Sequence, residues 1–166
     1  MARGARVAPV SLRYHFRQRL RAPAAAAFAW CVDFQESDGQ LFPSRHTRAV
    51  HWLGEDTAIL LDTTFAKGKP VRIHRLVRIN ADQKSWTNTH LDGPYQHSQY
   101  WYRIVPRGAR ASELDFTGHR LLWLSRAPSA ARVRRLTAAE RREDATMWRT
   151  SIAAALDRDL NRRRRK

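Results

Sequence analysis

The order of the predicted secondary-structure elements constrains the fold of this chain more than any single motif does. From Leu12 to Arg19 a mostly apolar set of residues alternates with a basic set, which is the two-residue period of a half-buried strand. Pro23 then suits the first turn of a helix, where its missing N–H costs nothing, and the alanine-rich run 24–34 predicts that helix. One more short helical turn is expected before Pro43.

Six further strands are predicted next, because six short segments are separated from one another by turn residues. They span 45–53, 57–65, 71–79, 85–91, 95–105 and 112–124. Such a series forms an antiparallel meander. The last segment is helical again, since its apolar residues recur every three or four positions, at Ala145, Trp148, Ile152, Leu156 and Leu160.

The resulting order is strand, two helices, six strands and one long helix, an α+β arrangement that resembles the START-domain (SRPBCC) superfamily. The resemblance rests on the opening strand that leads into "APAAAAFAWCVDF", on "WYRIVPRGARASELDFTGH" as two long closing strands, and on "MWRTSIAAALDRDL" as the final helix. It implies a helix-grip fold, in which a seven-stranded antiparallel sheet curves around the C-terminal helix. It covers residues 10–160, which we expect to form a single domain, and 161–166 would be a basic tail.

Other folds share parts of this pattern but not its order. A lipocalin-like barrel lacks the helix after the first strand, and a β-sandwich lacks both helices. A cystatin-like or nuclear-transport-factor-like cone places its helices differently. The helix-grip fold therefore accounts for the sequence best.

The chain is strongly basic, with 31 Lys and Arg against 15 Asp and Glu and a net charge of +16. Such a surface attracts polyanions, so non-specific contact with nucleic acid or anionic membrane is expected, although a general bias toward arginine would give the same composition. The single cysteine, Cys31, excludes an internal disulfide and is expected to be a small buried apolar residue. No segment is apolar enough for a membrane span or a signal peptide, so a cytoplasmic location is expected.

The helix-grip resemblance implies a largely apolar cavity between the sheet and the last helix. Strand alternation predicts which side chains face it, because successive residues of a strand point to opposite sides. The more apolar side of 112–124 is taken as the inner one, and the other strands are aligned to it. The predicted ligand-binding residues are Thr63, Arg75, Thr87, Thr89, Ser98, Tyr100, Tyr102, Phe116, Arg120, Trp148 and Ile152.

Arg75 and Arg120 are charges in otherwise apolar rows, and an unpaired buried guanidinium is costly. A structural interpretation gives Arg75 an internal acid such as Asp62, or lets its head group reach solvent. A functional interpretation gives it an anionic ligand, a carboxylate or a phosphate. The sequence leaves both open.

No cofactor and no metal site is predicted, because no HExxH, CxxC or similarly spaced ligand set is present. His90, His97 and His119 would form one patch only if two hairpins closed in a particular register. No pair of carboxylates and no nucleophile–base pair is recognisable, so no catalytic residue is assigned.

Three functions remain in view. The first is binding or transport of a hydrophobic or amphipathic small molecule, such as a lipid, a polyketide or an aromatic compound, and it requires no catalysis. The second is a cyclase- or dehydrase-like reaction in the same cavity, as in the enzymatic members of the superfamily. The third is a basic adaptor associated with nucleic acid or membrane.

Overall fold

A seven-stranded antiparallel sheet forms the centre of the protein, with strands in the order β1-β7-β6-β5-β4-β3-β2. The computed structural model describes residues 8–42, 46–66 and 68–163. The strands are β1 (Ala8–Leu20), β2 (His46–Trp52), β3 (Thr57–Ala66), β4 (Lys69–Asn80), β5 (Ser85–His90), β6 (Gln99–Pro106) and β7 (Ser112–Leu124). The helical elements are α1 (Ala24–Val32), η1 (Glu36–Leu41), α2 (Ala130–Met147), η2 (Trp148–Ile152) and α3 (Ala153–Arg163).

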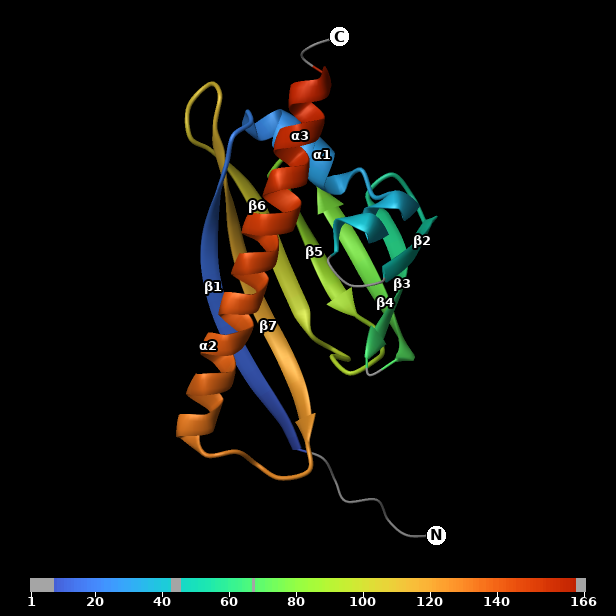
Figure 1. Cartoon of the computed structure of the whole chain (residues 1–166), viewed down its shortest axis with the longest axis vertical. Helices are drawn as coiled ribbons and strands as arrows, with labels where there is room; N and C mark the ends of the chain where they lie inside the picture. The colour runs from blue at the N-terminus through green and yellow to red at the C-terminus, as the bar shows by residue number, and fades with distance from the viewer. Residues whose placement is uncertain (1–7, 43–45, 67, 164–166) are drawn as a thin grey trace.

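The first strand pairs with the last one, from Ala8 opposite Leu124 to Leu20 opposite Ser112. Strands β2 to β7 form the meander, so β1 and β2 are the two edges of the sheet. The C-terminal helical segment runs along the sheet past β1, β7 and β6, and α1 lies beside α3 at one end of it (Figure 1). The predicted helix-grip architecture is therefore confirmed. Residues 164–166 of the expected basic tail lie outside the described residues.

The predicted alternation of β1 is confirmed by burial. Leu12, Tyr14 and Phe16 are buried, whereas Arg13 and His15 between them are exposed. The ring of Phe16 stacks on Phe116 of β7 with 4.5 Å between ring centroids. Tyr14, Phe16 and Phe116 belong to one core that includes residues of α1 and of the C-terminal helix, and burial of such large apolar groups dominates the stability of a domain of this size.

The last helix is continuous but contains one wide turn, the π-helical segment η2. The N–H of Ala153 bonds to the carbonyl of Trp148, which is the five-residue spacing of a π turn. The predicted apolar stripe is nevertheless on the inner side, because Trp148 and Leu156 are buried and Ile152 is partly buried. The wide turn therefore lies where the helix crosses the core.

The predicted register of β5 against β6 is wrong. Strand β6 begins at Gln99, and the segment before it is a loop. His97 adopts a positive φ of 67°, and the N–H of His97 bonds to the carbonyl of His90 while the N–H of His90 bonds to the carbonyl of Ser98. Two residues thus oppose one, as in a β-bulge, which shifts the side-chain alternation by one position. Between β6 and β7, Arg103 lies opposite Asp115, with 3.6 Å between a guanidinium nitrogen and a carboxylate oxygen.

Candidate functional site

A cavity of about 290 Å³ lies between the sheet and the C-terminal helix and is partly open to solvent. This volume is at the small end of the roughly 300–1,000 Å³ range of ligand pockets. Its apolar and aromatic lining includes Trp30, Cys31, Phe34, Leu60, Ile73, Trp86, Tyr102, Phe116, Trp148 and Ile152. Its polar lining includes Asp38, Arg48, Arg75, Asn88, His90, Tyr95, Tyr100, Arg120, Glu143 and Asp144.

The structure brings seven of the predicted site residues together on this lining. They are Arg75, Tyr100, Tyr102, Phe116, Arg120, Trp148 and Ile152. They come from three strands of the sheet, β4, β6 and β7, and from η2 of the last helix, so the inner side of these elements follows the periodicity expected from the sequence. Their role in binding stays a prediction.

Four predicted residues lie elsewhere. Thr87 and Thr89 line a shallow hollow with Trp101 on the outer face, because the bulge places the other parity of β5 inward. Thr63 follows Asp62 in β3, and since Asp62 points inward, Thr63 faces the opposite side. Ser98 is completely buried, and its Oγ accepts a hydrogen bond of 2.9 Å from the N–H of Leu121, which holds the loop before β6 to β7.

An aromatic wall forms one side of the cavity. The rings of Trp86 and Tyr102 are parallel, with centroids 4.7 Å apart and 1° between their planes. The ring of Tyr102 also meets that of Phe116 edge-on, with 5.0 Å between centroids, and its centroid lies 5.9 Å from that of Trp148. Trp86 points inward, whereas the sequence pattern had predicted Thr87 in that position. Stacked aromatic rings of this kind form a flat surface that suits another ring.

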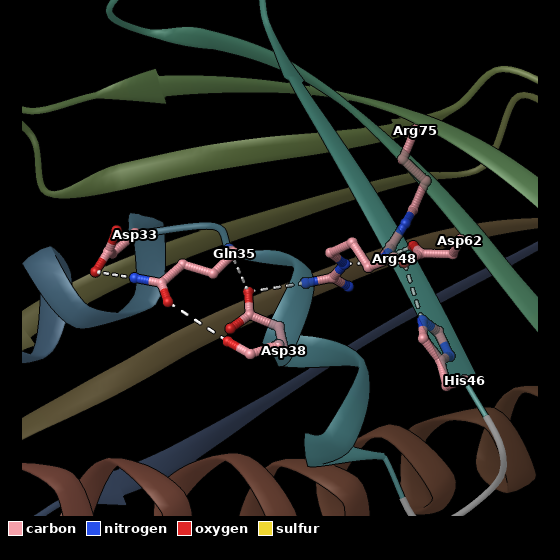
Figure 2. Close-up of polar contacts among 8 residues, drawn as sticks. Asp33, Gln35, Asp38, His46, Arg48, Asp62 and Arg75 are labelled. Atoms are coloured by element: carbon pink, nitrogen blue, oxygen red, sulfur yellow. Dashed lines mark hydrogen bonds and ion pairs between the residues drawn. The ribbon is translucent and has the colours of Figure 1, made fainter.

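The Asp62 cluster comprises His46, Arg48, Asp62, Arg75 and Asp38 (Figure 2). Asp62 is 2% exposed, and its Oδ1 accepts hydrogen bonds of 2.9 Å from both Arg48 Nε and His46 Nε2. The guanidinium of Arg75 forms an ion pair with the other oxygen. Arg48 also reaches Asp38 of η1 at 3.1 Å. Asp62 is therefore the internal acid that the structural interpretation assigned to Arg75.

Burial controls the protonation of this cluster. Burial, with the positive charges of Arg48 and Arg75, lowers the pKa of His46 to about 4, so its imidazole is neutral near pH 7. Burial and the charge of Arg48 lower the pKa of Arg75 to about 9, which still leaves it charged. Two cations and two carboxylates thus balance one another, and the cluster holds no spare positive charge.

The Arg120 cluster lies against the C-terminal helix and comprises Tyr14, Tyr100, Arg120, Glu140 and Asp144. Arg120 Nε donates a hydrogen bond of 3.0 Å to the hydroxyl of Tyr100, and its terminal nitrogens form ion pairs with Glu140 and Asp144. Tyr14 donates to Asp144 Oδ2 at 2.5 Å. Burial raises the pKa of both carboxyl groups, which the charge of Arg120 partly opposes. A carboxyl with a raised pKa can exchange a proton closer to neutral pH.

Glu140 and Asp144 were not predicted from the sequence as site residues. The signal was present, because Glu140, Asp144, Trp148 and Ile152 recur every four positions and so share one side of the helix. Two acids at the inner end of an apolar stripe need a cationic partner, and Arg120 was the unexplained charge in the facing strand. Asn88 and His90 were missed for a different reason: the even-numbered residues of β5 point inward, whereas the odd-numbered ones were predicted to do so.

Three buried polar atoms on the cavity lining have no hydrogen-bond partner within the described residues: Arg75 Nε, Asn88 Oδ1 and His90 Nδ1. Burial and the charges of Arg75 and Arg120 lower the pKa of His90 to about 3, so its imidazole is neutral. Buried polar atoms nearly always have partners. The three residues line the cavity, but these atoms themselves have almost no accessible surface, so a molecule inside the cavity reaches them once a neighbouring side chain rotates.

The three histidines considered for a metal patch are separated. His90 faces the cavity, the ring of His97 contacts Trp123, and His119 bonds to Ser11 at 2.7 Å. Across the described residues, no group of three His, Cys, Asp or Glu side chains is arranged to hold a metal ion. None of the helices in that part of the chain is both long and apolar enough to cross a membrane.

No protein-family model and no curated protein matches this sequence. Solved structures do match its fold. The Zhui aromatase/cyclase of Streptomyces sp. R1128 superposes with a TM-score of 0.72 at 13% identity, covering 91% of this chain and 96% of that one. A START superfamily protein of Mycobacterium smegmatis gives a TM-score of 0.67 at 14% identity, covering 88% of this chain and 97% of the other.

A third similar structure is norcoclaurine synthase of Thalictrum flavum in complex with dopamine and hydroxybenzaldehyde, with a TM-score of 0.57 at 14% identity, covering 74% of this chain and 77% of that one. At such low identity these likenesses concern the fold and not the activity. Together with the strand order and the position of the last helix, they establish that this chain has the helix-grip fold that these structures share.

Proposed function

We propose that the protein binds a small hydrophobic or amphipathic molecule in the cavity between the sheet and the C-terminal helix. The observation that carries this proposal is that one space is lined both by an aromatic wall and by residues with three buried polar atoms that have no partner among residues 8–42, 46–66 and 68–163. Apolar lining with a few placed polar groups is the usual composition of a ligand site. The volume favours a molecule of one or two rings, and the complex of norcoclaurine synthase with dopamine and hydroxybenzaldehyde supports this class.

Calorimetric titration with 2-naphthol, a two-ring amphipathic probe, tests the proposal. Ile73 lines the cavity from β4, and a tryptophan at this position should fill the space. Ile59 is the matched control, because it is a partly buried isoleucine on the opposite side of the adjacent strand β3. We expect binding to wild type and to Ile59→Trp, and none to Ile73→Trp, with all three folded by circular dichroism. Binding that survives Ile73→Trp would place the probe elsewhere and contradict the proposal.

A second candidate function, proton transfer during a cyclase- or dehydrase-like reaction, is favoured by Asp144. This carboxyl lines the cavity, is 8% exposed, has a raised pKa and is held in place by Tyr14 and Arg120. Such a group can take a proton from a carbon next to a carbonyl and return it. Exchange of the α-hydrogens of 2-tetralone in D₂O, followed by NMR, tests this. Wild type should accelerate the exchange and Asp144→Asn should not, while both still bind the ketone.

A further inference from the structure

The three partnerless atoms lie together on two neighbouring strands. Arg75 of β4 is directly opposite His90 of β5, and Asn88 is two positions before His90, on the same side of that strand. Asn88 and His90 are 6% and 8% exposed. A buried polar atom without a hydrogen bond destabilises the folded protein. Three such atoms beside one cavity therefore suit a ligand that supplies the missing hydrogen bonds.

The chemistry of these atoms defines what that partner must offer. Arg75 Nε can only donate, so it requires an acceptor. Asn88 Oδ1 can only accept, so it requires an N–H or O–H group. The neutral imidazole of His90 can serve either role at Nδ1, depending on its tautomer. A matching group therefore carries a donor and an acceptor side by side.

The charges around the cavity argue against an anionic group. Each arginine on the lining already has carboxylate partners: Arg48 and Arg75 share Asp62, and Arg120 pairs with Glu140 and Asp144. A carboxylate on the ligand would have to compete with an existing acid for one of these cations, and it would also approach the acids that line the same space. An uncharged polar group meets no such competition.

We propose that the ligand is a neutral one- or two-ring aromatic molecule with an adjacent donor and acceptor, as in a lactam or a hydroxy-carbonyl group, and that Arg75, Asn88 and His90 bind this group while the aromatic wall holds the ring. This proposal rests on the proposed function, because it specifies the ligand of the same cavity. The proposed neutral ligand differs from the carboxylate or phosphate that the sequence suggested as a partner for Arg75.

Calorimetry with three probes of similar size tests the proposal. 2-Quinolone carries an N–H beside a carbonyl, 1-methyl-2-quinolone lacks the donor, and 2-naphthoate is an anion. We expect 2-quinolone to bind roughly tenfold or more tightly than its N-methyl derivative, since the derivative leaves Asn88 unsatisfied. Asn88→Leu should remove that preference, whereas Thr87→Val, a change on the outer side of the same strand, should keep it. If Asn88→Leu does not fold, Asn88→Ala replaces it, with the same expected loss.

The outcomes separate the two proposals. Equal binding of 2-quinolone and its N-methyl derivative, or tightest binding of 2-naphthoate, would overturn the neutral donor–acceptor group and leave a binding cavity in place. A preference for 2-quinolone that persists in Asn88→Leu would also overturn it. Failure of these probes and of 2-naphthol alike would instead remove the proposed function itself.

Discussion

Tyr14 of β1 donates a hydrogen bond of 2.5 Å to Asp144 of α2, joining the first strand to the last helix across 130 positions in the sequence. The contact fastens the helix to the sheet at the side of the cavity. It also stabilises a charged carboxylate that burial would otherwise disfavour, since a hydrogen bond to the anion lowers the pKa that burial raises.

Tyr14→Phe should reduce the free energy of unfolding by about 1–3 kcal/mol, because it leaves Asp144 with one fewer donor in a buried place. Urea denaturation at pH 7 measures the change. Tyr95→Phe is the control, as it removes a hydroxyl of another tyrosine on the cavity for which the described residues show no hydrogen bond. Equal stability of Tyr14→Phe and wild type would show that the contact does not hold the helix.

Gly118→Ala should destabilise the protein by about 1–3 kcal/mol, because a Cβ at Gly118 would lie 2.5 Å from Cζ of Tyr14. The ring cannot move away freely, since its hydroxyl is bonded to Asp144. Gly54→Ala is the matched control, because nothing lies within 4 Å of a Cβ there. Thermal unfolding of both variants provides the comparison, and similar melting temperatures would contradict the close packing of Tyr14 on β7.

Asp62→Asn should destabilise the protein by about 3–5 kcal/mol, because it removes the charge that Arg48 and Arg75 share in a buried place. Asp33→Asn changes an exposed carboxylate and should have an effect within about 0.5 kcal/mol. Chemical denaturation at low and high salt measures both. If Asp62→Asn lowers the free energy of unfolding no more than Asp33→Asn does, Arg48 and Arg75 are hydrated in the folded protein and do not depend on Asp62.

Stability should fall as the pH drops below about 6.5. His46 and His90 bind a proton in the unfolded chain with an ordinary pKa of 6.5, but in the folded protein their pKa values are about 4 and 3. Between these limits the unfolded state holds more protons, so acid favours unfolding, by about 1.4 kcal/mol per pH unit for each histidine. The stability that these two neutral histidines contribute is fully present above pH 6.5 and is lost as the pH falls toward their folded-state pKa values.

Urea denaturation between pH 7 and pH 4.5 checks this dependence. His90→Phe should flatten the slope, whereas a change at the exposed His51 should not. An unchanged slope in His90→Phe would show that His90 is not the group that resists protonation.

The sequence by itself determined the architecture and much of the inner face. Alternation in β1 and β7 and the stripe on the last helix depend on local periodicity, which the chain carries in every short window. The pairing of Arg75 with Asp62 could also be anticipated, because both residues fall on the inner side of adjacent strands and a buried guanidinium requires an acid.

Only the tertiary structure decided which side of β5 faces the cavity and which acids meet Arg120. A single bulge at His97 exchanges Thr87 and Thr89 for Asn88 and His90, and a one-residue change in a loop leaves no periodic trace in the sequence. Asp144 reaches Tyr14 and Arg120 only because the helix folds back over β1 and β7, and the angle of that return is set by packing rather than by any local preference.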